Sequence, residues 1–187
     1  MEQKILEKIS EANRLGIMFA CGFSRGRHGS QTRLNGELHV EHVLRVALAT
    51  AKYTSACGLS GEDEYRLIAS AVLHDVVEDT STNEEEVVRL FGGDVARIVR
   101  ALSHVEEEEP DEVYLGRIAA AGHLAVLVKR FDRLDNLRSL RGAPTDFRAR
   151  KLAEVRKALP LWKEIDSEGS LLIEELLQEV EHESTAC

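Results

Sequence analysis

Helical periodicity is the feature that most restricts the fold of this chain. Apolar residues recur three and four positions apart through most of the sequence, and this spacing places them on one side of an α-helix. The alternation of β-branched and polar residues that is typical of strands is not found. We therefore expect an all-α fold of about eight to ten helices. The predicted helices cover residues 5–21, 37–57, 62–79, 82–90, 95–102, 112–121, 123–141, 145–165 and 170–181.

Glycine-rich and charged segments mark the expected loops. Residues 22–36 contain four glycines and no apolar period, so we expect an irregular loop there. The acidic run at 106–109 precedes Pro110, which indicates a second loop followed by the start of a helix. The charged end of the chain, residues 182–187, is expected to be frayed.

The composition is that of an ordinary globular protein. The 187 residues are 43% hydrophobic and 30% charged, which is enough for one domain with its own core. No internal repeat or long linker divides the chain. We therefore expect a single domain over residues 1–187, with a motif-bearing core at 28–140 and C-terminal helices at 145–181.

Charge and cysteine content restrict the partners and the compartment. No stretch reaches the roughly 18 apolar residues that cross a bilayer, and the charged N-terminus is not a signal peptide. The net charge of −9 argues against non-specific binding of nucleic acid. The three cysteines are an odd number without metal-like spacing, which fits a reducing cytoplasm. We expect a cytoplasmic protein that binds neither membrane nor nucleic acid; a homodimer is compatible with the sequence.

Titratable side chains interrupt the most apolar of the predicted helices. Residues 69–73 are mostly apolar, and His74, Asp75, Glu78 and Asp79 follow directly. On a helix His74 lies one turn from Glu78, and Asp75 lies one turn from Asp79. Because these groups are costly to bury unless they are neutralised, we expect a divalent metal here. The adjacent His74 and Asp75 would give it one nitrogen and one oxygen ligand.

Such a metal needs further ligands from other helices. The upstream candidates are His28, His39 and His42. His42 lies in an apolar-rich stretch of its predicted helix, and His39, three residues earlier, can share its face.

The downstream segment 126–137 repeats the anomaly. Asp132 follows an apolar helical run, and Asn136 lies one turn further on the same face. A set with mixed nitrogen and oxygen ligands suits Mn²⁺, Fe²⁺ or Zn²⁺, with Mn²⁺ favoured by the oxygen content. The set is His42, His74, Asp75 and Asp132.

Arginine is concentrated on the glycine-rich segment. Residues 12–36 contain four arginines, including Arg25 and Arg33, and no acid. In an acidic protein, this concentration favours the binding of an anionic small molecule.

The spaced ligand set resembles the H…HD…D signature of the HD superfamily of metal-dependent phosphohydrolases. Within it, the sequence is most similar to RelA/SpoT-type hydrolase domains and to the MESH1-like small alarmone hydrolases. Four segments carry this resemblance, in the order of the family's motifs. They are HGSQTRLNGE at 28–37, LHDVVEDT at 73–80, FGGDVARIV at 91–99 and VKRFDRLDNLR at 128–138.

The resemblance implies an HD-domain fold and a metal-dependent hydrolysis of a phosphate ester or pyrophosphate on a nucleotide. The implied substrate is guanosine 3′,5′-bis(diphosphate), which would lose its 3′-pyrophosphate, and the implied cofactor is Mn²⁺, with Fe²⁺, Zn²⁺ and Mg²⁺ as alternatives. By resemblance, Glu78 and Asp79 orient or deprotonate the attacking water and protonate the leaving group. The residues expected to bind the substrate are Arg33, Lys129, Asn136, Arg25 and Arg148.

Departures from the family pattern keep two alternatives open. Val43, Phe131 and Asp135 replace a proline, a small residue, and a histidine or tyrosine, and Leu34 replaces a basic residue. The loss of that positive charge leaves open a phosphohydrolase for another nucleotide, such as a 5′-nucleotidase or a dinucleotide phosphatase. A non-catalytic metal-binding regulatory protein is the third interpretation, which the acidic pair at 78–79 argues against. With about 47 residues after the last motif, we expect no synthetase domain.

Overall fold

The computed structural model describes residues 1–104 and 109–185. Its regular structure is helical, apart from one isolated bridge between Thr32 and Leu38, so the predicted all-α class is confirmed. The α-helices are α1 (Glu2–Leu6), α2 (Glu11–His28), α3 (His39–Cys57), α4 (Gly61–Leu73), α5 (Val76–Asp79), α6 (Glu84–Phe91), α7 (Gly93–Leu102), α8 (Asp111–Ala121), α9 (His123–Ser139), α10 (Thr145–Ile165) and α11 (Ser167–Thr185). A 3-10 helix, η1 (Leu140–Gly142), follows α9.

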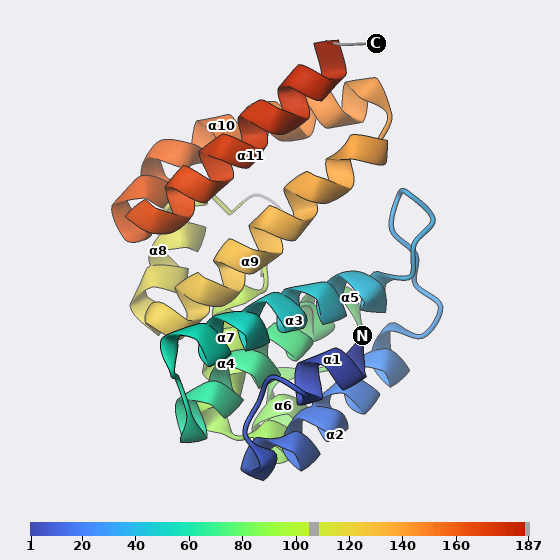
Figure 1. Cartoon of the computed structure of the whole chain (residues 1–187), viewed down its shortest axis with the longest axis vertical. Coiled ribbons are helices and arrows are strands. Elements are labelled where there is room, and N and C mark those ends of the chain that lie inside the picture. The colour runs from blue at the N-terminus through green and yellow to red at the C-terminus, as the bar shows by residue number, and fades with distance from the viewer. Residues whose placement is uncertain (105–108, 186–187) are drawn as a thin grey trace.

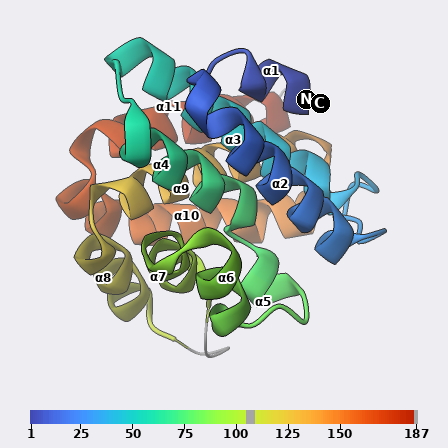
Figure 2. The ribbon, with the colours of Figure 1, turned by 90° about the horizontal axis from the view of Figure 1, so that it is seen from below.

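The helices pack around α3, α4 and α9 (Figures 1 and 2). Helix α3 lies against α4 and α9, and α2 covers α4. Helices α10 and α11 pair with each other and lie over α8 and α9 (Figure 1). One hydrophobic cluster extends from Ile5 to Val180 and includes Leu44, Leu73 and Leu127 as fully buried side chains. Within the described residues, no helix is both long and apolar enough to cross a membrane.

The first predicted helix is divided into α1 and α2. The break is stabilised by the buried carboxylate of Glu64, which accepts hydrogen bonds from the backbone N–H of Ser10 at 3.1 Å and from the Asn13 side chain at 2.7 Å. Ser10 is the N-cap of α2, with an extended ψ of 145°. The apolar stripe continues across this turn, and periodicity alone could not detect it.

The prediction of a loop over residues 22–36 is wrong for its first half. Helix α2 continues to His28, and the irregular segment begins at Gly29, whose φ is +53°. The buried positions of this last part are Ser24 and His28, while Gly22 and Gly26 are exposed. Because the buried side chains are polar, they leave no apolar period in the sequence.

The predicted helix over residues 62–79 is interrupted at its titratable pair. Helix α4 ends at Leu73 and α5 begins at Val76. Asp75, between them, has φ −100° and ψ −5°, close to the sparsely populated bridge region in which many active-site residues are found. Because of this interruption, the side chains of residues 78–79 do not follow the helical spacing from residues 74–75 that the sequence predicted.

The end of the chain also differs from the prediction. Helix α11 continues through Thr185, so residues 182–185 are helical rather than frayed, and residues 186–187 lie outside the described part. The start of α8 directly after Pro110 is confirmed. Of the predicted acidic loop, residues 106–108 lie outside the described part.

Candidate active site

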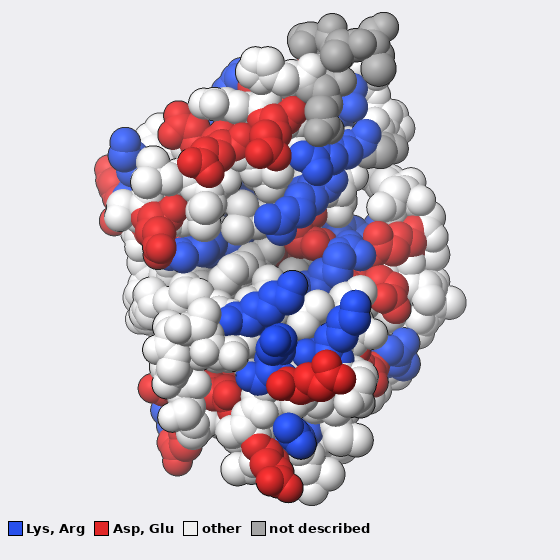
Figure 3. Space-filling model, viewed as in Figure 1, with Lys and Arg blue, Asp and Glu red and all other residues white. Residues whose placement is uncertain are grey.

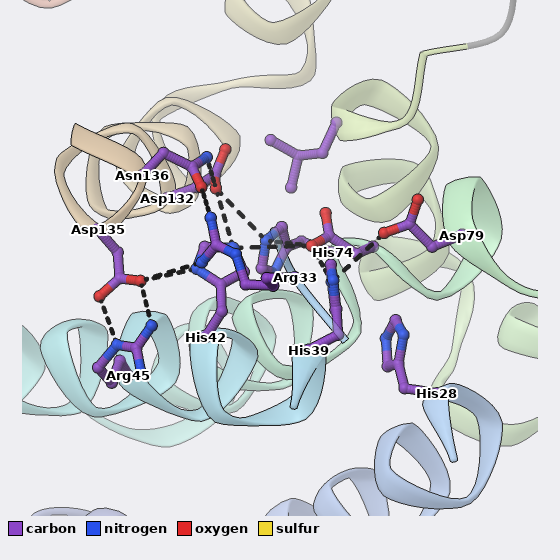
Figure 4. A network of polar contacts seen from close by, with 12 residues as sticks. His28, Arg33, His39, His42, Arg45, His74, Asp79, Asp132, Asp135 and Asn136 are labelled. Carbon is purple, nitrogen blue, oxygen red and sulfur yellow. Dashed lines mark hydrogen bonds and ion pairs between the residues drawn. The ribbon is translucent and has the colours of Figure 1, made fainter. Parts of the chain in front are cut away.

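The four predicted metal ligands lie together in the structure, and Figure 4 shows three of them, His42, His74 and Asp132. His42 comes from α3, His74 and Asp75 from the junction of α4 and α5, and Asp132 from α9. Nε2 of His42 lies 3.2 Å from Oδ1 of Asp132 and 3.7 Å from Oδ2 of Asp75. Nε2 of His74 lies 3.1 Å from Oδ2 of Asp75 and 3.7 Å from Oδ1 of Asp132. Each imidazole nitrogen therefore lies within 3.7 Å of both carboxylates, around one ligand point. The ligand atoms of His42, His74 and Asp75 are all close enough to one another to hold an ion, and Asp132 adjoins them through the two histidines.

The ring of His74 is oriented so that one nitrogen is available to a metal. Its Nδ1 donates to the carbonyl oxygen of Ala71 at 2.8 Å, so the lone pair of the neutral ring is on Nε2. Nε2 is buried and has no hydrogen-bond partner within the described residues. A buried acceptor without a donor, beside two carboxylates, fits a divalent cation.

Asp132 is held by two neighbours on its own helix. Nζ of Lys129 donates to Oδ2 at 2.8 Å, and Nδ2 of Asn136 donates to Oδ1 at 2.7 Å. Burial opposes ionisation of Asp132, but Lys129 and the adjacent His42 and His74 hold its pKa well below the ordinary value. The carboxylate is therefore ionised and fixed in orientation.

The charges of the ligand set compensate one another when no cation is bound. Burial disfavours the charged form of His74, but Asp75 and Asp132 raise its pKa well above the ordinary value. In His42, burial is likewise outweighed by hydrogen bonds to Asp132 and Asp135, which raise its pKa. Protons on the histidines thus supply positive charge between the carboxylates, and a bound cation would replace them.

The acidic pair of α5 lies beside the ligand set and points in two directions. Oε2 of Glu78 accepts a hydrogen bond from the backbone N–H of His104 at 2.8 Å. Oδ2 of Asp79 lies 3.3 Å from Nε2 of His39. Burial raises the pKa of both carboxyl groups, and the charge of Asp75 raises that of Asp79 further. Both groups are therefore better proton carriers near neutral pH than ordinary carboxylates.

The other two upstream histidine candidates lie on one side of the ligand set. Nε2 of His39 lies 2.8 Å from Oδ2 of Asp75, and His28 stacks on the His39 ring at 4.6 Å between centroids. His39, Asp75 and Asp79 form a second group whose ligand atoms are close enough to hold an ion. This group shares Asp75 with the set of His42 and His74, so the two groups belong to one site.

A cavity of about 370 Å³ opens beside Asp132, between α9, α10 and the loop that follows α2. Four basic residues line it: Arg33, Lys129, Arg133 and Lys151. Apolar residues, among them Leu140 and Phe147, also line it. In Figure 3, basic side chains form a band across the middle of the molecular face, with acidic groups around it. The cavity combines positive charge with an apolar surface next to the candidate metal ligands.

Arg33 connects this cavity to the ligand set. Its Nη2 donates to Oδ1 of Asn136 at 2.6 Å, and Asn136 in turn holds Asp132. Nη1 of Arg33 is buried without a hydrogen-bond partner in the described residues, at 3.6 Å from Oδ2 of Asp135. This nitrogen thus makes an ion pair with Asp135 but no hydrogen bond within the described residues.

Two of the predicted substrate-binding residues lie apart from this cavity. Arg25 pairs with Glu2 at 2.5 Å on the surface of α2, and Arg148 of α10 is not among the described lining residues. Their roles stay predictions.

The cavity also contains two basic residues that the sequence did not single out, Arg133 and Lys151. Two features of the sequence could have indicated them. Arg133 directly follows Asp132, and the segment from 133 to 163 has more basic than acidic residues.

A helical domain with an adjacent histidine–aspartate pair at a helix junction is typical of the class of HD-domain proteins. The sequence model of the HD domain matches residues 20–112, which include His42, His74 and Asp75. The chain belongs to the HD-domain family. Within it, the chain belongs to the group that contains MESH1 of Drosophila melanogaster, a guanosine-3′,5′-bis(diphosphate) 3′-pyrophosphohydrolase. Its identity to MESH1 is 40% over 129 residues, which cover 66% of this chain and 69% of MESH1.

Two further relatives support this assignment. A guanosine-3′,5′-bis(diphosphate) 3′-pyrophosphohydrolase of Aquifex aeolicus is 36% identical over 130 residues, which cover 66% of this chain and 18% of that protein. A solved structure of a metazoan orthologue of SpoT, described as hydrolysing ppGpp, superposes with a TM-score of 0.70 at 28% identity. The superposition covers 87% of this chain and 94% of the other.

Proposed function

We propose that this protein is a metal-dependent phosphohydrolase that removes the 3′-pyrophosphate of guanosine 3′,5′-bis(diphosphate). The observation that carries the proposal is the basic cavity opening directly onto Asp132 of the His–Asp set. A substrate with a purine, a ribose and two diphosphates needs both the positive charge and the apolar lining of such a cavity. The relatives that bear this activity in their names support the choice of nucleotide.

The ligand set would hold one divalent cation through His42, His74, Asp75 and Asp132. Two nitrogen and two oxygen donors favour Mn²⁺ over softer ions, with Fe²⁺, Zn²⁺ and Mg²⁺ as alternatives. When bound, the cation would supply Lewis acidity, which lowers the pKa of water and polarises a phosphoryl oxygen.

The reaction requires water to attack the phosphorus atom next to the ribose 3′-oxygen. The bond between that phosphorus and the 3′-oxygen breaks, the oxygen takes up a proton, and the products are GDP and pyrophosphate. Glu78 and Asp79 would orient the water, accept its proton and return a proton to the 3′-oxygen. Their raised pKa values suit this exchange near neutral pH.

Positive side chains would bind the diphosphates. Arg33 has a buried Nη1 without a hydrogen-bond partner in the described part of the chain, which a phosphate oxygen can satisfy. Lys129 already contacts Asp132 and would bring its charge close to both the carboxylate and the substrate. Asn136 would act at the same place, between Arg33 and Asp132.

A nucleotide panel tests the proposal. The protein with Mn²⁺ is incubated with ppGpp, GTP, nucleoside 5′-monophosphates and a phosphorylated dinucleotide, and the products are separated by anion-exchange chromatography. We expect GDP and pyrophosphate from ppGpp. Turnover of another nucleotide alone would favour the second interpretation from the sequence, and no turnover with any substrate would favour a metal-binding regulatory protein.

A further inference from the structure

We propose that Asp135 is a positioning residue of the metal centre, which holds the Nδ1 proton of His42 and directs Nε2 of that ring at the ligand point. The inference rests on the proposed metal site, in which His42 is one ligand. Asp135 is neither a candidate ligand nor one of the described residues that line the cavity. No step of the proposed reaction uses this carboxylate. It is nevertheless an ionisable group that is only 6% exposed, and a buried charge needs a partner.

The contact between Asp135 and His42 determines which nitrogen can bind metal. Oδ2 of Asp135 lies 2.8 Å from Nδ1 of His42, and the ring is 2% exposed. A carboxylate only accepts hydrogen bonds, so Nδ1 carries the proton and donates it. In a ring with its proton on Nδ1, the lone pair is on Nε2, the atom that lies 3.2 Å from Asp132. Metal-bound histidines in proteins commonly make such a second hydrogen bond, which fixes the ring and raises its basicity.

Asp135 is itself held so that it cannot rotate away from His42. Arg45 donates from Nε to Oδ1 at 2.8 Å and from Nη2 to Oδ2 at 3.0 Å, which is a two-point contact. Nη1 of Arg45 is in turn bound by Glu37. The contacts therefore run from Glu37 through Arg45 to Asp135 and end on the His42 ring. Figure 4 shows the part from Arg45 to His42.

Asn136, the next residue of α9, orients another candidate ligand, Asp132. Asn136 donates to Oδ1 of Asp132 at 2.7 Å. Two successive residues of α9 thus orient two candidate ligands, one on α3 and one on α9 itself. The contact of Asp135 to His42 joins α9 to α3 at the residues that would hold the metal, which gives a reason for a buried carboxylate at position 135.

The affinity for Mn²⁺ tests the role of Asp135 without any nucleotide. Free Mn²⁺ is measured by electron paramagnetic resonance during titration of the unmodified protein, Asp135→Asn and Arg45→Met. We expect Asp135→Asn to weaken Mn²⁺ binding about 10- to 100-fold, as is usual for the loss of such a partner. Arg45→Met removes one anchor of the same carboxylate but leaves the carboxylate beside His42, so its Mn²⁺ affinity should fall less than that of Asp135→Asn. Equal affinity of Asp135→Asn and the unmodified protein would overturn the inference.

A second measurement uses the unmodified protein and does not depend on the variant folding. In protein loaded with Zn²⁺ and labelled with ¹⁵N-histidine, NMR should show His42 with a hydrogen on Nδ1 and none on Nε2. A hydrogen on Nε2 with the metal on Nδ1 would contradict the role of Asp135. If the unmodified protein bound no Mn²⁺, the proposed metal site would fail as well, and the titration separates that result from a failure of Asp135 alone.

Discussion

Nε2 of His42 lies 3.2 Å from Oδ1 of Asp132, although the two side chains come from different helices, α3 and α9. Both are nearly fully buried, at 2% and 4% exposure. In this environment the ion pair is costly to desolvate, and removal of one member leaves an uncompensated charge. A positive charge between the carboxylates, from protons or from a cation, therefore compensates this buried pair between α3 and α9.

Removal of one ligand should abolish metal binding. His74→Ala takes away a buried nitrogen without a hydrogen-bond partner in the described residues, so elemental analysis should find no stoichiometric metal in the purified variant. The melting temperature of the unmodified protein should rise on addition of Mn²⁺, because a ligand that binds only the folded state stabilises it. That rise should be absent in the variant. Unchanged metal content in His74→Ala would contradict the assignment of the ligands.

Loss of the acidic pair should affect turnover but not metal. Glu78→Gln keeps an oxygen that can accept the hydrogen bond from His104 and removes the ionisable group. We expect normal metal content and a decrease in kcat of about 10²- to 10⁴-fold. The same is expected of Asp79→Asn. A loss of metal in Glu78→Gln would instead make this residue a ligand.

The pH dependence of turnover should report the same pair. Because burial raises the pKa of Glu78 above its ordinary value of 4.5, its basic form is lost at a higher pH than that of an exposed glutamate. The kcat of the unmodified enzyme should therefore fall with decreasing pH while the pH is still above that value. Glu78→Gln should lack this acidic limb. An acidic limb that persists unchanged in the variant would assign it to another group.

Arg33 should act on substrate binding and on the ligand set together. Arg33→Ala removes Nη1, which has no hydrogen-bond partner in the described residues, and also the contact of Nη2 to Asn136. We therefore expect a higher KM for the nucleotide and a smaller decrease in kcat. Arg33→Lys keeps a positive charge but not the two-point geometry, and should be intermediate. An unchanged KM with a lower melting temperature in Arg33→Ala would identify a structural residue.

A glycine on α11 should be essential for the packing of the C-terminal helices. A Cβ at Gly169 would lie 2.0 Å from Oδ2 of Asp166 and 2.7 Å from Nε of Arg130, which form a buried ion pair. Gly169→Ala should displace this pair and lower the free energy of unfolding by on the order of 3 kcal/mol. Gly26→Ala is the matched control, since it lies on the exposed side of α2 with open space around its Cα. There alanine should stabilise by about 0.5–1 kcal/mol. Chemical denaturation measures both, and equal effects would contradict the account of Gly169.

The sequence predicted the helical class and the residues that converge on the ligand point, because a histidine and carboxylates in apolar helices are conspicuous. It did not predict the break at Ser10, which depends on the distant Glu64, or the helical conformation of residues 22–28, whose buried side chains are polar. The role of Asp135 was also hidden, because its partners His42 and Arg45 are on another helix. Contacts between distant segments leave no local pattern in the sequence.

The central claim is that the chain hydrolyses the 3′-pyrophosphate of ppGpp at the His–Asp centre. The most direct measurement incubates Mn²⁺-loaded protein with ppGpp and follows the phosphorus products by ³¹P NMR, with His74→Ala in parallel. The account predicts GDP and pyrophosphate in equal amounts from the unmodified protein and neither from the variant. Release of orthophosphate, turnover by His74→Ala at the unmodified rate, or no reaction in the metal-loaded protein would contradict it.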